Sequence, residues 1–194
     1  MSDIKENKKV LREEFQRRRT AFYNQLDSAT RNLAFRRPPS PLKTILEGAG
    51  TIGIYASRGS EAPTHRLIEY FSEQEKRIAF PVVLGAAPLE FRLVSDIKLL
   101  EVGFMGIAEP GTDCSLAKPD VVITPMIAFD RSMNRLGQGG GHFDRTFDKY
   151  SEAKRIGLAW SVQETQEIPV EDHDIALDAI VTESELIQKV DMTS

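Results

Sequence analysis

Residues 126–145 read Met126-Ile-Ala-Phe-Asp130-Arg-Ser-Met-Asn-Arg135-Leu-Gly137-Gln-Gly-Gly-Gly141-His-Phe-Asp144-Arg145, and they contain four of the thirteen glycines of the chain. The apolar run 121–124 just before them predicts a buried strand. Phe143, Phe147 and Tyr150 follow at helical spacing and predict a helix that begins near Gly141 or His142. A strand, a glycine loop and the start of a helix therefore follow one another, and the other elements are predicted around this unit.

The glycine loop 137–141 has two interpretations. At the start of a helix, backbone N–H groups and the positive end of the helix dipole favour an anion such as phosphate. Glycine permits close approach because it lacks a Cβ and tolerates positive φ, and Arg135 and Arg145 flank the loop. The loop lacks the Lys-Ser/Thr ending of a Walker A loop, and His142 stands where a dinucleotide-binding motif has its third glycine. The glycines alone are equally consistent with a turn that only reverses the chain.

Predicted strands and helices alternate along the chain. Strands are expected at 51–56, 77–83, 89–94, 120–124, 155–160 and 179–182, and helices at about 3–26, 42–47, 64–74, 141–150 and from Glu183 onward. This order predicts a single α/β domain over residues 1–194, with three layers, a mostly parallel, Rossmann-like sheet and helices on both faces. Ligands bind such sheets beyond the carboxyl ends of the strands. The loops after residues 56 and 124 are therefore the expected ligand-binding loops.

The first predicted helix, at about 3–26, is amphipathic. Its apolar face carries Ile4, Leu11, Phe15, Phe22 and Leu26. Lys8 and Arg12 lie one turn apart on the flank of this face. The run Arg17-Arg18-Arg19 goes round the helix, and we expect it to form a solvated surface. A basic amphipathic helix that binds a membrane or a partner is the alternative, and the negative net charge of the chain argues against it.

Composition excludes several classes of protein. A hydrophobic content of 41% and a charged content of 28% are ordinary for a soluble globular protein. The net charge of −4 argues against a dedicated nucleic-acid binder. Cys114 is the single cysteine, so neither an intrachain disulfide nor a four-cysteine zinc site can form, and a reducing, cytoplasmic setting is expected. The sequence shows no apolar run near the ~20 residues that span a bilayer, and its charged start does not resemble a secretory signal.

Several motifs together resemble one enzyme family. Phe129-Asp130, Asn134-Arg-Leu-Gly137 and Gly139-Gly-Gly-His-Phe-Asp144-Arg145 resemble the signature of the 5-formyltetrahydrofolate cyclo-ligase family, also called methenyltetrahydrofolate synthetases. Lys8-Lys-Val-Leu-Arg12 is similar to the family's K-x-x-L-R, Glu61-Ala-Pro-Thr64 to its E-[IV]-x-T, and Gly106-Ile-Ala-Glu-Pro110 to its G-I-P-E-P. The motifs occur in family order, and the resemblance spans residues 8 to about 182.

The resemblance implies a reaction and a fold. The reaction is the ATP-dependent cyclisation of 5-formyltetrahydrofolate to 5,10-methenyltetrahydrofolate, with Mg²⁺ as cofactor and with ADP and phosphate released. It implies phosphorylation of the formyl oxygen and attack by N10. The fold would be similar to that of sugar-phosphate isomerases and CoA transferases. The substrate, with or without a polyglutamate tail, and ATP are the expected partners of a chain that we expect to be a monomer.

The resemblance also implies which residues form the site. Those expected to bind ATP are Lys8, Arg12, Arg135, Gly137, Gln138, Gly139, Gly140, Gly141, His142 and Phe143, and those expected to act in catalysis are Arg135, His142 and Arg145. Tyr55, Glu61, Phe104 and Met105 are expected to bind the folate. Asp144 and Asp178 are expected to bind Mg²⁺, a hard ion that prefers carboxylate and phosphate oxygens. Spacing alone does not favour Asp178 over Asp172 or Asp174.

The same residues have plainer interpretations. Lys8 and Arg12 would be ordinary surface cations, and Glu61 and Asp144 would be carboxylates favoured by a helix dipole. Gln138 stands where the family more often has arginine, and His142 where many members have tyrosine. Two alternatives to the cyclo-ligase follow: another phosphate-binding enzyme on the same scaffold, or a folate-binding protein without catalysis.

Overall fold

The computed structural model describes residues 2–103 and 106–188. Its helices are α1 (Ser2–Gln25), α2 (Ser28–Leu33), α3 (Ser40–Glu47), α4 (His65–Glu73) and α5 (His142–Lys149). Its strands are β1 (Thr51–Ile54), β2 (Arg77–Val82), β3 (Glu90–Leu93), β4 (Glu101–Val102), β5 (Ala108–Glu109), β6 (Leu116–Ala117), β7 (Val121–Pro125), β8 (Ala128–Phe129), β9 (Arg135–Leu136), β10 (Lys154–Leu158), β11 (Ala179–Val181) and β12 (Leu186–Gln188). Short 3-10 turns occupy Ile97–Leu99 and Ser161–Gln163.

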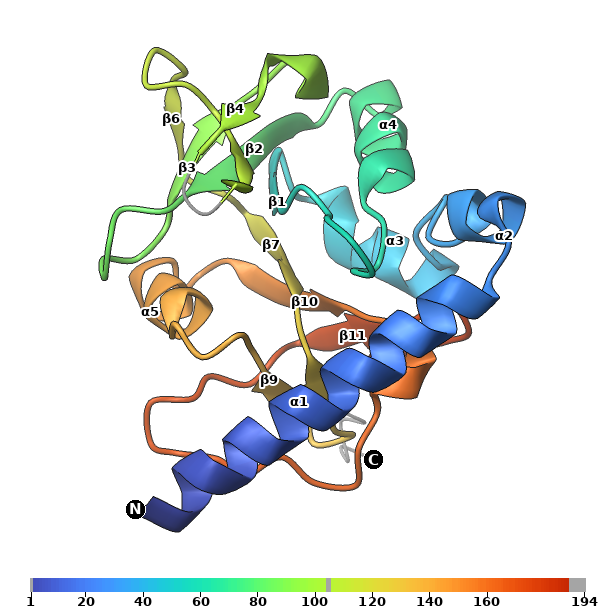
Figure 1. The fold of residues 1–194 in the computed structure, drawn as a ribbon. Helices are drawn as coiled ribbons and strands as arrows, with labels where there is room; N and C mark the ends of the chain where they lie inside the picture. The colour runs from blue at the N-terminus through green and yellow to red at the C-terminus, as the bar shows by residue number, and fades with distance from the viewer. Residues whose placement is uncertain (1, 104–105, 189–194) are drawn as a thin grey trace, which may run out of the picture.

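A single sheet of eight strands forms the centre of the molecule, in the order β12-β11-β10-β7-β1-β2-β3-β6. The pairs β11-β10, β10-β7, β7-β1 and β1-β2 are parallel, whereas β12, β3 and β6 are antiparallel to their neighbours. Residues of the central strands are buried on both faces, as a parallel sheet between helices requires. The predicted α/β class with a mostly parallel sheet is confirmed (Figure 1).

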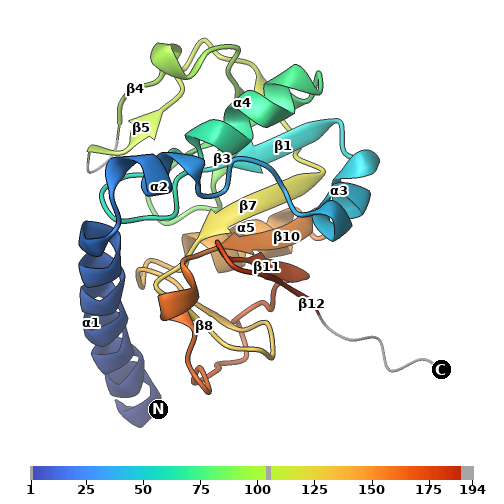
Figure 2. The same cartoon turned by 90° about the vertical axis from the view of Figure 1, so that its right-hand side faces the viewer.

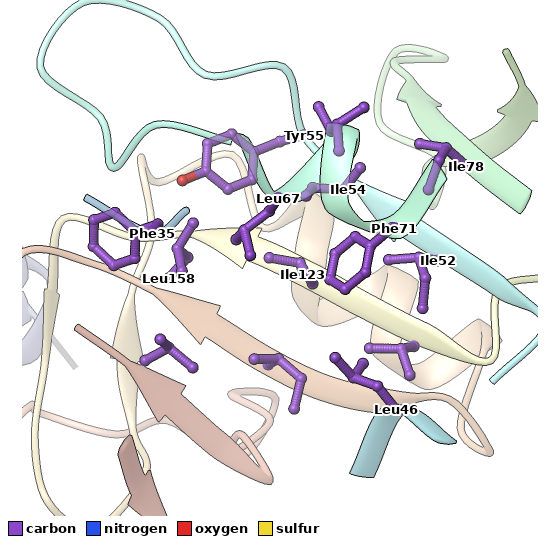
Figure 3. Close-up of a cluster of buried hydrophobic side chains, with 14 of the residues drawn as sticks. Phe35, Leu46, Ile52, Ile54, Tyr55, Leu67, Phe71, Ile78, Ile123 and Leu158 are labelled. Carbon is purple, nitrogen blue, oxygen red and sulfur yellow. The ribbon is translucent and has the colours of Figure 1, made fainter. Parts of the chain in front are cut away.

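Helices cover the two faces of the sheet unequally. Ile52, Ile54 and Ile123 point to one face and pack with Leu67 and Phe71 of α4 (Figure 3). On the other face, Val122 and Ile180 pack with Phe147 of α5. Successive strand residues thus alternate between two apolar clusters. Burial of both clusters is the main force that fixes the three layers.

The order of the strands places a topological switch point between β1 and β7, and the region beyond the carboxyl ends of these two strands is called the crevice below. From β1 the chain passes to β2 on one side, while from β7 it passes to β10 and β11 on the other side. Because β1 and β7 are neighbours, the loops that follow them diverge at the carboxyl edge of the sheet, where α/β proteins bind ligands. Helix α1 lies along this edge, beside the β8–β9 hairpin (Figures 1 and 2). Of the described helices, none combines the length and the apolar character that a membrane crossing requires.

The structure corrects two expectations about the elements. The helix expected from Glu183 is absent from residues 183–188, which turn back and form β12, antiparallel to β11, with Ile187 opposite Ile180. The Thr182 hydroxyl accepts from the backbone N–H of Glu185 and stabilises this turn. Helix α2 was not predicted, although Asp27 caps it by accepting from Thr30 N. Residues 95–103 and 106–115 contain a 3-10 turn and the two short strands β4 and β5.

Candidate functional site

A tight hairpin carries the glycine loop. Strand β8 pairs with β9, and the carboxylate of Asp130 accepts hydrogen bonds from the backbone N–H groups of Ser132 and Asn134 at 2.9 and 3.1 Å. The Asn134 side chain donates to the same carboxylate at 3.0 Å, and so does the backbone N–H of Ile168 at 2.9 Å. Asp130 and Asn134 of the signature therefore have a structural role: they fix the turn from which the loop projects.

The glycine loop runs from β9 into α5, and two of its residues need glycine. Gly139 has φ of +97° and Gly141, the N-cap of α5, has φ of +63°. A Cβ on Gly139 would lie 3.4 Å from the guanidinium carbon of Arg12, and a Cβ on Gly141 would lie 2.7 Å from Arg145 Nη1. Both arginines hold the loop, because Arg12 Nε donates to Gly137 O at 2.9 Å and Arg145 Nη2 donates to Gly140 O at 2.7 Å.

Arg135 lies under the loop and is nearly inaccessible, with 4% of its side chain exposed. Its Nη2 lies 2.9 Å from Asp144 Oδ1, and its guanidinium faces the rings of Phe143 and Phe147. Burial lowers the pKa of Arg135, whereas the charges of Asp144 and Asp174 raise it. Since the reference pKa of arginine is above 12, Arg135 stays charged at neutral pH and places a fixed cation beneath the loop.

Four buried nitrogens around the loop have no hydrogen-bond partner among residues 2–103 and 106–188. They are Arg135 Nε, Arg135 Nη2, Arg145 Nε and His142 Nδ1, and of these Arg135 Nη2 lies within ion-pair distance of Asp144. Buried polar groups are nearly always satisfied in native proteins, so each exception needs an explanation. A ring of unsatisfied nitrogens beside positive-φ glycines and a helix N-terminus fits an anion with several oxygens.

Lys8 of α1 reaches the same region from the other side. Its Nζ donates to Glu171 Oε2 at 2.9 Å and to Asp174 Oδ2 at 2.5 Å, and 7% of its side chain is exposed. Burial lowers the pKa of Lys8, but the hydrogen bonds to Asp174 and Glu171 outweigh burial and raise it. Burial raises the pKa of Asp174, but Lys8 and the Glu171 N–H outweigh burial and lower it. The hydrogen bond from Lys8 lowers the pKa of Glu171 as well, so all three groups are charged at neutral pH.

The two carboxylates predicted to bind magnesium are placed differently. Asp144 lies on the first turn of α5 beside the loop, paired with Arg135. Asp178 lies at the amino ends of β10 and β11, where its carboxylate accepts from the backbone N–H and the guanidinium of Arg155 at 2.7 to 3.1 Å. Burial raises the pKa of Asp178, but Arg155 outweighs burial and lowers it. Because the loop is at the carboxyl edge of the sheet, this placement does not support Asp178 as a partner of Asp144.

Asp174 is the acid that the fold brings toward Asp144. The backbone N–H of Ile175, the next residue, lies 3.5 Å from Asp144 Oδ1. The negative charges of Asp144 and Asp174 both act to raise the pKa of Arg135. Within the described part of the chain, no group of three His, Cys, Asp or Glu side chains could hold a metal alone. A metal here would therefore need oxygens from a ligand, which is how Mg²⁺ commonly binds beside phosphates.

The other end of the crevice follows β1 and carries Glu61. Glu61 Oε2 accepts from the backbone N–H of Arg58 at 3.0 Å. Burial raises the pKa of Glu61, while the hydrogen bond from Arg58 and the charges of Arg19 and Arg58 oppose that rise. The Tyr55 hydroxyl donates to Ala62 O at 2.6 Å, and only 5% of Tyr55 is exposed. Burial, followed by the Glu61 charge, raises the pKa of Tyr55 well above its usual value. Tyr55 thus packs in the core and supports the Glu61 loop.

Arg19 corrects the prediction that the run 17–19 is a solvated surface. It is 5% exposed, and its Nε donates to Ser60 Oγ at 3.1 Å while its Nη1 lies 3.5 Å from Met126 O. Arg17 and Arg18 are exposed, as predicted. A signal was present in the sequence, because Arg19 follows Arg12 by seven residues and Lys8 by eleven, which places all three on one side of a helix.

The remaining predicted residues are located as follows. Gln138 and Gly140 lie in the loop between β9 and α5, and Phe143 lies on the first turn of α5 with its ring facing Arg135. Phe104 and Met105 lie outside the described residues. The sequence does not predict Glu171, and spacing alone does not distinguish Asp174 from Asp172 and Asp178. Nothing in the spacing shows that the loop 164–178 returns to α1.

Taken together, the crevice has a cationic end and an acidic end joined by one helix. The cationic end combines backbone N–H groups, Lys8, Arg12, Arg135 and Arg145 and suits a polyphosphate. The acidic end offers the carboxylate of Glu61, which suits a ligand with N–H donors. Such a crevice can bring a phosphoryl donor and a nitrogen heterocycle next to each other.

Comparisons with known proteins find one matching family, related sequences and a similar structure. The family model described as the 5-formyltetrahydrofolate cyclo-ligase family matches residues 4–183. The 5-formyltetrahydrofolate cyclo-ligase of Escherichia coli K12 is 36% identical over 146 residues, which cover 71% of this chain and 80% of that protein. The protein of the same name from Haemophilus influenzae is 33% identical over 138 residues, covering 66% and 73%. The structure of Aquifex aeolicus 5,10-methenyltetrahydrofolate synthetase is similar, with a TM-score of 0.76, 25% identity and coverage of 96% and 95%.

Proposed function

The chain belongs to the 5-formyltetrahydrofolate cyclo-ligase family, and we propose that its crevice binds ATP at the glycine-loop end and 5-formyltetrahydrofolate at the Glu61 end. Its activity is that of a 5-formyltetrahydrofolate cyclo-ligase, or methenyltetrahydrofolate synthetase, and the family uses ATP as co-substrate. The proposal concerns which residues do this work. The observation that carries it is the ring of buried, unsatisfied nitrogens of Arg135, His142 and Arg145 around the glycine loop.

The glycine loop and its arginines form the proposed phosphate site. Loop N–H groups from Gly137 to Gly141 donate to phosphate oxygens, and Gln138 and Phe143 border the nucleotide. Arg135 is held rigidly by Asp144 and two aromatic rings, so it needs little reorganisation when negative charge develops. His142 and Arg145 each offer a buried nitrogen that the described protein leaves unsatisfied.

Lys8 and Arg12 complete the phosphate site from α1. Arg12 already lies over Gly139 and contacts Gly137 O, so it can add a guanidinium contact without moving far. Lys8 is held by Glu171 and Asp174. A phosphate oxygen that binds Lys8 must therefore replace one of these carboxylates. Binding of ATP at Lys8 is then an exchange of one anionic partner for another, and its net free energy is the difference between the two contacts.

The residues near the loop fit Mg²⁺ with help from the nucleotide. Asp144, and Asp174 rather than Asp178, would hold the ion, since both lie beside Arg135 at the loop end. Mg²⁺ commonly takes one or two carboxylates and completes its shell with waters and phosphate oxygens. When bound, the ion would neutralise phosphate charge during transfer.

Glu61 is the proposed folate contact. Its carboxylate can accept from pterin N–H groups, and its loop is fixed by Tyr55 and by the hydrogen bonds of Thr64, whose hydroxyl donates to Tyr55 O at 2.9 Å. Phe104 and Met105 remain proposed neighbours of the pterin on the resemblance alone. A monomeric state, a cytoplasmic location and acceptance of polyglutamylated substrate are also proposed on that ground.

The reaction divides into two displacements. The formyl oxygen attacks the γ-phosphorus of ATP, ADP leaves, and an imidate phosphate forms on N5. N10 then attacks the formyl carbon, its proton is released, and phosphate departs with the former formyl oxygen to give the methenyl ring. Such a transfer mainly requires positioning and charge stabilisation. Arg135, His142 and Arg145 would stabilise the moving phosphate, and no protein nucleophile is needed.

One assay separates the proposal from its alternatives. Protein, Mg-ATP and 5-formyltetrahydrofolate are mixed, and the methenyl chromophore and released phosphate are followed together. Equal amounts of both products support the cyclo-ligase. Phosphate release that folate does not stimulate would indicate another phosphate-binding enzyme, and folate binding without either product would indicate a binding protein.

A further inference from the structure

One face of α1 contacts both loops of the crevice. Lys8, Arg12, Phe15 and Arg19 follow one another at spacings of four, three and four residues and therefore lie on one side of the helix. Phe15 is 2% exposed and packs with Leu136 and Ile127, which hold the helix to the β8–β9 hairpin. At 1.5 Å per residue, Arg19 lies roughly 16 Å along the helix from Lys8. Its partners are therefore different from those of the two proposed nucleotide cations.

Arg19 joins the loop after β1 to the loop after β7. Its Nε donates to Ser60 Oγ at 3.1 Å, and its Nη1 lies 3.5 Å from Met126 O, directly after β7. The same Ser60 accepts a hydrogen bond from Trp160 Nε1 on its carbonyl at 3.0 Å. The Thr20 hydroxyl lies 3.2 Å from Ser60 Oγ as well, so the residue before Glu61 is held by three side chains from distant parts of the chain.

Arg19 also acts on the charge of Glu61. Two residues affect that carboxylate besides burial: Arg58 through its backbone N–H and its charge, and Arg19 through its charge. The Glu61 charge in turn raises the pKa of the neighbouring Tyr55. Burial disfavours the ionised form of Glu61, and the two arginines favour it. Because charges interact strongly where water is scarce, a buried guanidinium here has more effect than an exposed one.

We propose that Arg19 is a positioning residue for the folate: it holds Ser60 and keeps the adjacent Glu61 in its charged form, facing the crevice. The proposal rests on the proposed function, in which the Glu61 carboxylate accepts from the pterin. Arg19 itself makes no contact with the reacting atoms. Its location on α1 also means that the helix carrying Lys8 and Arg12 orients the folate-binding carboxylate.

The pH dependence of folate use distinguishes positioning from a merely structural role. Glu61 binds folate when ionised, so kcat/KM for 5-formyltetrahydrofolate should fall as pH falls through the raised pKa of Glu61. In Arg19→Gln the opposing positive charge is lost, so this acidic limb should move to higher pH. At neutral pH, KM for folate should rise about tenfold or more, the low end of the range for a hydrogen bond to a charged group.

The experiment compares Arg19→Gln and five further variants with the wild type in steady-state assays from pH 5 to pH 9, a range chosen to bracket the shifted limb. Arg19→Lys keeps the charge and should restore most of the wild-type limb. Arg18→Gln is the matched control, because Arg18 is the preceding residue of the helix, is 52% exposed and pairs with Glu14. Ser60→Ala removes the anchor of Arg19 and should move the limb in the same direction by less. Glu61→Gln alone and combined with Arg19→Gln tests whether both changes act on one carboxylate.

The outcomes are distinct. A shifted limb in Arg19→Gln that disappears in the Glu61→Gln background supports the proposal. An unmoved acidic limb in Arg19→Gln overturns it and assigns Arg19 a structural role. So does an equal loss of kcat/KM when Arg19→Gln is introduced into the wild type and into Glu61→Gln. If Arg19→Gln does not fold, an unmoved limb in Ser60→Ala overturns it. If Glu61→Gln leaves folate KM unchanged, the proposed role of Glu61 fails, and absence of turnover in the wild type would contradict the proposed function itself.

Discussion

At the glycine-loop end of the crevice, Lys8, Arg12, Arg135 and Arg145 each contact an oxygen of the chain, whereas at the other end the partly buried carboxylate of Glu61 is influenced by the charge of Arg19. The first arrangement shares its positive charge over several partners, so Lys8 has a raised pKa, Asp174 has a lowered one and both stay ionised near neutrality. The second depends on one carboxylate whose pKa is raised by burial. The phosphate end should therefore tolerate changes of pH, and the folate end should be sensitive to them.

The largest expected effect concerns the shape of the phosphate end. Gly141→Val places a side chain where φ is +63° and where Arg145 Nη1 would lie 2.7 Å from its Cβ. Turnover should fall at least about a hundredfold, as when a single preorganised donor is removed from an active site. Gly85→Val is the matched control, with φ of +56° and open space around its Cβ. It carries the same backbone strain of about 1–3 kcal/mol.

Thermal unfolding and steady-state rates of the two glycine variants separate strain from function. Both should lose similar stability, but only Gly141→Val should lose activity. A folded Gly141→Val that retains near-normal turnover would show that the loop is only a turn. The glycine-loop end of the crevice would then no longer be a phosphate site.

Glu61→Gln tests the acidic end. It keeps the shape of the side chain but replaces one acceptor oxygen with an NH₂ donor. Folate binding should weaken by about 1.5–3 kcal/mol, roughly tenfold to a hundredfold, and binding of Mg-ATP should change little. Because the ionised form binds, the wild type should lose folate affinity as pH falls through the raised pKa of Glu61, and the variant should not.

Isothermal titration of each ligand checks this prediction. Glu69→Gln on α4 is the control, since Glu69 is an exposed acid paired with Arg66 at 2.7 Å. Equal loss of both ligands in Glu61→Gln would mean that the change disturbs the fold rather than one end of the crevice.

The third prediction concerns which aspartates bind Mg²⁺ at the phosphate end. Asp144→Asn and Asp174→Asn should raise the Mg²⁺ concentration for half-maximal rate by about tenfold, the lower range for disturbed metal sites. Asp178→Asn should leave the magnesium dependence unchanged and lower the free energy of unfolding by about 1–3 kcal/mol, because the Arg155 contacts weaken. Rates measured over a magnesium series, with chemical denaturation of each variant, decide the matter. A magnesium effect in Asp178→Asn alone would restore the first assignment.

The two ends also differ in how far the sequence predicts them. The phosphate end is local: the hairpin, the glycines, Arg135, Asp144 and Arg145 lie within one stretch, so strand, loop and helix could be predicted from periodicity and glycine chemistry. The α/β class was predicted for the same reason, since buried strands alternate with amphipathic helices. Arg12, which the resemblance assigns to the ATP site, contacts the loop through its hydrogen bond to Gly137 O.

What sequence did not predict depends on long-range packing. Arg19 meets Ser60 forty-one residues away and Met126 one hundred and seven residues away, and Lys8 meets Asp174 across one hundred and sixty-six. Such pairings leave no periodic pattern, which is why Arg19 was predicted to be solvated and why spacing alone does not distinguish Asp178 from Asp174. Strand β12 was predicted as helix because residues after Glu183 carry no strong period, and pairing with β11 decided their conformation.

The smallest expected effect concerns the exchange of anions at Lys8. Glu171 Oε2 lies 2.9 Å from Lys8 Nζ, so in Glu171→Gln a phosphate oxygen would compete with one carboxylate instead of two. A partly exposed ion pair is worth about 0.2–1 kcal/mol, so Mg-ATP should bind up to about fivefold more tightly. Glu6→Gln is the control, because Glu6 is 66% exposed and lies 3.7 Å from Lys9 on the same helix. Calorimetric titration of both variants with Mg-ATP measures the change. Weaker binding in Glu171→Gln would mean that Glu171 orients Lys8 toward the phosphate rather than competing with it, and the phosphate end would then depend on a partly buried acid as the folate end does.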